Sequence, residues 1–233
     1  MSTLHEHRFP DTKALTHALS GELQVGLQEA IAARGAASMA VSGGRTPAAL
    51  FKQLSEEKLD WHKVWVTLVD ERWVDVSSET SNEHLVKTSL LQGRASNARF
   101  VGLKNTADTP QAGTDWCWRT LTKLPRPFDV VLLGMGDDGH TASLFPNNIQ
   151  LRQALTLTEP AGCVAMHAPV EPHDRISLNL SAILDARRII VLIQGDSKWS
   201  VYQRARTAGA VTDLPIRAVL QQQLVPVDIF WAP

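Results

Sequence analysis

The sequence predicts an α/β protein built on a mostly parallel sheet with helices on both faces. Four uninterrupted apolar runs alternate with helical segments, a pattern typical of parallel strands that are buried on both sides. Two later segments, 163–168 and 175–179, alternate enough to predict a small antiparallel or edge addition. No linker, repeat or low-complexity stretch divides residues 1–233, so we expect a single domain. The four apolar runs lie near residues 38, 66, 130 and 190.

Composition excludes several classes of protein. The chain has 233 residues, of which 44% are hydrophobic and 20% charged, enough for a sizeable core. A formal charge of -1 argues against nucleic-acid or membrane-surface partners, although it permits a small anionic ligand. The chain has no signal-like leader and no long apolar segment, which predicts a cytoplasmic protein. Cys117 and Cys163 have no metal-ligand spacing, so we expect free buried thiols.

The first helix is predicted from a leucine stripe that begins at Leu15 and repeats every four residues to Ile31. Asp11 is expected to cap its beginning and Gly35 to end it. This helix is interpreted as scaffold.

The next unit is a short strand, 36–42, followed by the run SGGRTP at 42–47. Thr46 suits a helix N-cap and Pro47 the first helical position. Two glycines before a helix N-terminus can bind an anion through free backbone N–H groups, although an ordinary tight turn also favours glycine. The candidate ligands here are Ser42, Gly43, Gly44 and Thr46.

A second buried strand, 64–69, ends in Asp70, Glu71 and Arg72. Such a charge run is usually a solvated face. Helices are expected from Ser81 to Leu91 and from Thr109 to Leu124, with a short apolar piece at 100–103 between them.

The most informative stretch is LGMGDDGHTASLFP, residues 133–146, which follows the apolar strand 128–133. Three glycines in six positions require tight turns or a close approach. The acids and His140 among them suit proton transfer, whereas the structural alternative is a histidine that caps the next helix. The strand 188–193 then leads into GDSK at 195–198 and a further helix, and the segment 227–231 forms the last strand.

All four polar runs follow the carboxyl ends of predicted strands, where parallel sheets bind their ligands. We therefore interpret them as one site. Arg175 and Lys198 suit a phosphate together with the glycine loop. Asp70, Arg72, Asp138 and His140 are left for the reacting end, with His140 as general base and Arg72 facing a developing oxyanion. Asp138 either orients the imidazole or shapes its loop.

Residues 134–139 also match the dinucleotide fingerprint GxGxxG. This interpretation is disfavoured because acids occupy the positions closest to a pyrophosphate, and because the motif does not follow the first strand. No acid ends a strand about twenty residues later, where a ribose would need it.

SGGRTP, VDERWV with SN downstream, and GMGDDGHTASLFP together resemble the 6-phosphogluconolactonase family, over about residues 10–232. The resemblance implies a Rossmann-like fold shared with glucosamine-6-phosphate isomerases. It implies hydrolysis of the phosphorylated sugar lactone 6-phospho-D-glucono-1,5-lactone to 6-phosphogluconate, in the second step of the pentose phosphate pathway, without metal or cofactor. The family's catalytic His falls on His140, its active-site Arg on Arg72, and its phosphate ligands on the 42–46 loop, Arg175 and Lys198. Asp75 stands where the family leads us to expect proline.

A related isomerase/deaminase is the alternative enzyme. Similar deaminases carry a carboxylate a few residues after the histidine, in a run like FNEP, whereas residues 143–146 here read SLFP. A non-catalytic sugar-phosphate sensor would normally need an effector domain, for which 233 residues leave no room. We expect a monomer or weak homodimer.

Overall fold

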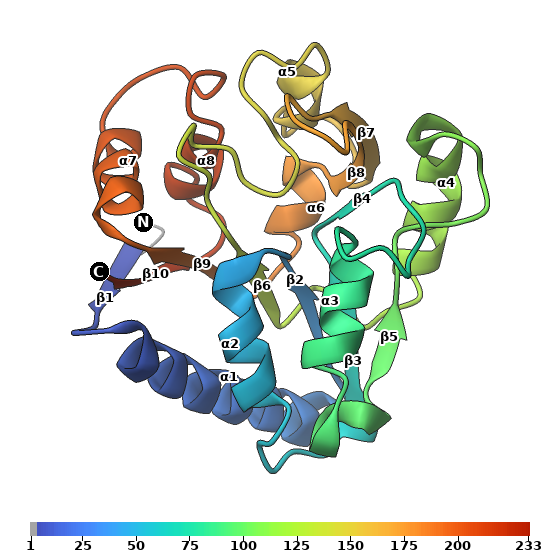
Figure 1. The fold of residues 1–233 in the computed structure, drawn as a ribbon, viewed down its shortest axis with the longest axis vertical. Helices are drawn as coiled ribbons and strands as arrows, with labels where there is room; N and C mark the ends of the chain where they lie inside the picture. The colour runs from blue at the N-terminus through green and yellow to red at the C-terminus, as the bar shows by residue number, and fades with distance from the viewer. Residues whose placement is uncertain (1–3) are drawn as a thin grey trace.

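The computed structural model describes residues 4–233, and its centre is a seven-stranded sheet in the order β1-β10-β9-β6-β2-β3-β5 (Figure 1). Neighbouring strands in this sheet run parallel, and helices pack on both of its faces, as predicted. The strands are β1 Leu4–Arg8, β2 Ala37–Val41, β3 Val64–Leu68, β5 Arg99–Val101, β6 Val130–Leu133, β9 Ile189–Gln194 and β10 Val227–Ala232.

The apolar runs occupy the middle of the sheet because they are buried on both sides. Every residue of β2 and of β6 is buried, so neither strand shows the alternation of a half-exposed strand. The first and last strands, β1 and β10, pair in parallel at one edge of the sheet (Figure 1).

Side-chain caps begin several helices where the sequence predicts them. Asp11 accepts from the Ala14 N–H and Ser81 from the His84 N–H, while Gly35 ends the first helix at a φ of 79°. No helix within residues 4–233 is long and apolar enough to cross a membrane. The helices are α1 Thr12–Arg34, α2 Arg45–Leu54, α3 Asn82–Ser89, α4 Pro110–Leu121, α5 Leu151–Ala154, α6 Leu180–Leu184, α7 Asp196–Arg206 and α8 Ile216–Leu220, with 3₁₀ turns at Trp61–Lys63 and Gly93–Asn97.

A separate three-stranded antiparallel sheet, in the order β4-β8-β7, lies beside α4 and α6 (Figure 1). Its outer strand β7 (Cys163–His167) and middle strand β8 (Asp174–Leu178) are the predicted antiparallel addition. Its third strand, β4 (Asp70–Arg72), was not expected. The charge run forms a strand because it pairs with β8 directly after β3 ends.

One local expectation is wrong, and the structure excludes two alternatives that the sequence had left open. Thr46 is not an N-cap, because Gly44 begins α2 with a φ of 107° and Thr46 lies inside the first turn. The run 70–72 is not a solvated face, since Asp70 is 7% exposed and Glu71 is fully buried. His140 does not cap a helix, because in the described structure turns follow it until α5 begins at Leu151.

Asp75, the departure from the expected proline, lies in a turn after β4. Its carboxylate accepts from the Ser77 N–H at 2.8 Å and from the Ser77 hydroxyl at 2.6 Å. An Asx-type turn therefore supplies the local bend that we expected a proline to supply.

Candidate active site

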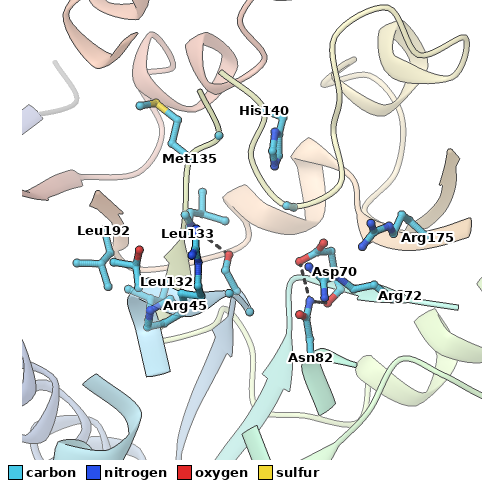
Figure 2. Close-up of a pocket in the computed structure, with 18 of the residues that line it drawn as sticks. Arg45, Asp70, Arg72, Asn82, Leu132, Leu133, Met135, His140, Arg175 and Leu192 are labelled. Atoms are coloured by element: carbon cyan, nitrogen blue, oxygen red, sulfur yellow. Dashed lines mark hydrogen bonds between the residues drawn. The ribbon is translucent and has the colours of Figure 1, made fainter. Parts of the chain in front are cut away.

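The carboxyl ends of β2, β3, β6 and β9 face a cavity of about 330 Å³. All but one of the predicted site residues line it, and the exception, Asp138, contacts the His140 ring. Figure 2 shows Arg72 and Arg175 on one side of the cavity, Arg45 on the other, and His140 above them. The predicted residues that line it are Ser42, Gly43, Gly44, Thr46, Asp70, Arg72, His140, Arg175 and Lys198.

The loop after β2 needs its glycines for two different reasons. A Cβ on Gly43 would lie 1.8 Å from Oδ1 of Asn82, so a larger residue would displace that amide. Gly44 has open space around it but a φ of 107°, which side-chain-bearing residues rarely adopt. Ser42 joins this loop to the next one by accepting from the Gly134 N–H at 3.1 Å.

Asp70 is held at the cavity wall by contacts from two other segments. Ser143 donates its hydroxyl to Asp70 Oδ2 at 2.6 Å, and the Asn82 amide donates to the Asp70 carbonyl at 2.8 Å. Both partners are buried. The carboxylate therefore has a defined position in the cavity wall, beside the Asn82 amide (Figure 2).

Glu71 points away from the cavity and fastens β4 to the N-terminus of α3. Its carboxylate accepts from the N–H groups of Arg72, Asn82 and Glu83, each at 2.7 Å, and from the Ser81 hydroxyl at 2.9 Å. Burial raises the pKa of this carboxyl even though four donors favour its charged form. One buried side chain thus connects the N-terminus of α3 to β4, the strand that carries Arg72.

Arg72 and Arg175 are cross-strand partners between β4 and β8. Arg72 donates to the Thr80 carbonyl, but within residues 4–233 no acceptor meets its Nε or the Nε of Arg175. Arg175 is 4% exposed, and burial together with the charge of Arg72 lowers its pKa to about 10, against the opposing effect of Asp70 and Glu71. Two adjacent guanidinium groups with unused donors form a strong site for an anion.

The glycine loop after β6 folds back on itself to present His140. The Gly136 N–H donates to the His140 carbonyl at 2.9 Å, and Gly139 turns the chain with a φ of 76°. A Cβ on Gly136 would lie 2.2 Å from His140 Nδ1. The imidazole packs at a tilt against the Phe145 ring, with centroids 4.5 Å apart.

Asp138 contacts His140 twice. Its Oδ1 lies 2.5 Å from the ring Nδ1 and accepts from the backbone N–H of His140 at 3.1 Å. The structure therefore supports both roles that the sequence left open. With Nδ1 occupied, the other ring nitrogen, Nε2, is available for proton transfer.

The dinucleotide interpretation of 134–139 finds no support in this geometry. A pyrophosphate site needs a helix that starts at the glycines, and none starts there in the described part of the chain. The helix N-termini at the cavity are instead those of α2 and α7, and Lys198 lies in the first turn of α7.

Sequence reasoning missed several residues of the wall. Arg45 and Asn82 stand inside motifs that were singled out, so a polar side chain next to a glycine turn was a usable signal. The apolar members carry no such signal, because in the sequence they look like core residues. These are Met135, Ala142, Phe145, Val170 and Leu192, together with the strand-end leucines 132 and 133.

Comparison with known proteins gives one consistent family. The family model described as glucosamine-6-phosphate isomerases/6-phosphogluconolactonase matches residues 10–231. A 6-phosphogluconolactonase of Rhizobium meliloti is 44% identical over 97% of this chain and 98% of its own length. One of Pseudomonas putida is 42% identical over 97% of this chain and 92% of its own.

Solved structures agree. The crystal structure of a 6-phosphogluconolactonase from Shewanella baltica superposes with a TM-score of 0.95, at 48% identity, over 99% of this chain and 98% of that one. A monomeric glucosamine-6-phosphate deaminase shares the fold, with a TM-score of 0.80 at 17% identity over 98% of this chain and 97% of that one.

Proposed function

Because the chain belongs to the glucosamine-6-phosphate isomerase/6-phosphogluconolactonase family, we propose that it hydrolyses 6-phospho-D-glucono-1,5-lactone to 6-phospho-D-gluconate. The observation that carries this proposal is the joint lining of one cavity by His140, the Arg72–Arg175 pair and Lys198. A phosphorylated lactone presents an anion and an electrophilic carbonyl, and the cavity offers cations and a base.

In the proposed reaction, Nε2 of His140 takes a proton from a water molecule while the water oxygen attacks C1 of the lactone. The carbonyl becomes a tetrahedral oxyanion, which Arg72 and N–H groups of the 134–140 loop stabilise. When this intermediate collapses, the bond from C1 to the ring oxygen breaks. The imidazolium then returns its proton to that oxygen, so that the base is regenerated.

The substrate phosphate is proposed to bind the 42–46 loop, Arg175 and Lys198. The unmet donors of buried Arg175 support this role, because such a group gains most from an incoming anion. Asp70 is proposed to contact the sugar. Its fixed position, on the buried hydroxyl of Ser143, suits an acceptor that recognises a substrate hydroxyl.

The isomerase/deaminase alternative is disfavoured by the residues around His140. The resemblance leads us to expect an acid shortly after the histidine in a deaminase, whereas here Phe145 packs on the ring and Ser143 binds Asp70. Of the described residues that line the cavity, Asp70 is the one carboxylate. Water attack on a lactone does not need a second one.

We also propose that the enzyme works without metal or cofactor, in the cytoplasm, as one domain and as a monomer or weak homodimer. In support of metal independence, residues 4–233 hold no cluster of three His, Cys, Asp or Glu side chains that could bind a metal ion.

The test is a comparison of two substrates on the same pure protein. Freshly made 6-phosphogluconolactone should be hydrolysed well above a no-enzyme blank, while glucosamine-6-phosphate should release no ammonia. Unphosphorylated gluconolactone is the matched control and should react far more slowly. Deamination without lactone hydrolysis would replace the proposal with the alternative.

A further inference from the structure

Two thiols meet at the side of the small sheet, away from the residues that line the active-site cavity. Cys117 of α4 and Cys163, the first residue of β7, are 46 positions apart in the sequence, yet their Sγ atoms lie 3.0 Å apart. Cys117 is fully buried and Cys163 is partly buried. Both are free thiols in the described structure, as the sequence predicted.

One cation acts on this pair through its charge. Arg126 acts electrostatically on Cys163 and is held between the rings of Trp118 and Phe128, at 4.8 and 4.3 Å from their centroids. Its Nε donates to Asp185 at 2.6 Å, whereas no described residue accepts from its buried Nη1. The charge of a guanidinium acts in favour of the thiolate, and Arg126 also has a structural role in its ion pair with Asp185.

We propose that Cys117 and Cys163 form a reversible intrachain disulfide when the protein meets a peroxide or a low-molecular-weight disulfide. The observation that carries the proposal is the contact between the two sulfur atoms, which lie 3.0 Å apart on two different elements of the fold.

The reaction with peroxide balances as follows. The Cys163 thiolate attacks one peroxide oxygen, the O–O bond breaks, and hydroxide leaves with the proton that the thiol lost, as water. The resulting sulfenic acid is attacked by the Cys117 thiol, the S–S bond forms, and the sulfenic oxygen leaves as a second water. Two thiols are oxidised and one peroxide is reduced. With a low-molecular-weight disulfide, the Cys163 thiolate attacks one sulfur and releases the first small thiol, and the Cys117 thiol then attacks the Cys163 sulfur of the mixed disulfide and releases the second.

The resting pair should react slowly at neutral pH. The hydrogen bond with Cys117 and burial raise the pKa of the Cys163 thiol well above its usual value, and Arg126 opposes them. Because the thiolate is the nucleophile, the rate should rise steeply between pH 7 and pH 9.

The disulfide would connect α4 covalently to the small sheet that carries Arg72 and Arg175. α4 also packs against Trp73, the residue after Arg72, since a Cβ on Gly113 would lie 2.4 Å from that ring. β7 pairs with β8, where Met166 faces Arg175. A covalent bond between α4 and β7 closes a long loop, so the oxidised protein should unfold at a higher temperature, by about 5 °C or more.

The experiment treats the folded protein with hydrogen peroxide or oxidised glutathione at pH 8 and follows its intact mass. We expect a loss of about 2 Da per chain, a fall from two titratable thiols to none, full reversal by dithiothreitol, and the higher melting temperature. Lactone hydrolysis should be retained by the oxidised protein, because neither cysteine lines the cavity in the described structure.

Cys117→Ala is the matched control: its remaining thiol should gain oxygen or glutathione instead of losing 2 Da. Arg126→Gln should slow disulfide formation in an otherwise intact pair. Mixed disulfides, intermolecular dimers or persistent free thiols in the folded wild-type protein would each overturn the proposal, and that readout does not depend on whether the variants fold.

Discussion

Nδ1 of His140 lies 2.5 Å from Oδ1 of Asp138, two residues earlier on the same glycine loop. Burial raises the pKa of the Asp138 carboxyl, but the hydrogen bond to His140 and the charge of its ring outweigh burial and hold that pKa below its usual value. The carboxylate is therefore ionised at neutral pH. In the proposed mechanism it would hold the ring in one orientation and balance the imidazolium formed during proton transfer.

Asp138→Asn removes the charge but keeps an oxygen that can accept from the His140 N–H. This variant should have a lower kcat, with a loss smaller than the roughly 10²–10⁴-fold that a general base contributes. Its KM should stay within a few-fold of the wild-type value. Asp138→Ala removes both contacts and should be worse. Wild-type kcat for the Asn variant, with a loss for the Ala variant alone, would reduce Asp138 to a loop-shaping residue.

Alanine substitutions at Gly136 and Gly134 form a matched test of how strongly the reaction depends on the orientation of His140. Gly136→Ala would put a Cβ 2.2 Å from His140 Nδ1, so the ring must leave its position and kcat should fall at least about tenfold. Gly134→Ala meets no described heavy atom within 4 Å and should keep near wild-type kcat. Both variants should unfold near the wild-type temperature, and equal activities would mean that the orientation of His140 does not limit the reaction.

Arg175→Met should stabilise the free protein while it weakens substrate binding. A buried guanidinium beside Arg72, with an unmet Nε in the described structure, costs stability that an apolar chain does not, about 1–3 kcal/mol. Loss of a charge-assisted contact of about 1.5–3 kcal/mol should raise KM about tenfold or more. Thermal melts and steady-state kinetics test both, and a variant that is less stable with unchanged KM would contradict the assignment.

The effect of Arg175→Met on stability should depend on pH. The pKa of Arg175 is about 10 in the folded protein, below its unfolded value of 12.5. The charged guanidinium therefore destabilises the folded state to its full extent at neutral pH. It is relieved as pH rises through about 10, where the native state loses the proton. The stability gap between Arg175→Met and wild type should therefore narrow above pH 10.

Exhaustive chelation should leave lactone hydrolysis unchanged, because the proposed steps use side chains and water alone. Treatment with EDTA followed by gel filtration, with metal content measured by mass spectrometry, tests this expectation. A loss of rate that a divalent ion restores would show that the reaction needs a metal.

Much of the scaffold could be predicted because its signals are local. Caps at Asp11 and Ser81 depend on a side chain that reaches an N–H three residues on, and the double-sided burial of β2 and β6 leaves continuous apolar runs. α5, α6 and α8 have four or five residues each, too few for a helical period to show. β4 depends on pairing with a strand about a hundred positions away, which no local pattern encodes.

The polar half of the candidate site could be predicted for a different reason. Glycines are needed where the backbone turns tightly or where another group approaches it closely. Gly43, Gly44 and the 134–139 loop can therefore be recognised in the sequence, and with them the charged residues next to these glycines. Phe145 and Leu192 have no such marker, because a cavity wall and a core select the same apolar side chains. The cross-strand contact of Arg72 with Arg175 is likewise a product of register, which the sequence does not display.

The most direct test of the proposed mechanism is the kcat of His140→Asn for 6-phosphogluconolactone, measured rapidly and corrected for spontaneous hydrolysis. The substitution keeps a polar side chain of similar reach but removes the proton acceptor. We predict a fall of about 10²–10⁴-fold in kcat, a KM within a few-fold of wild type, and the loss of the acidic limb of the pH profile. A corrected kcat near wild type, in a variant that unfolds at the wild-type temperature, would contradict the assignment of His140 as general base.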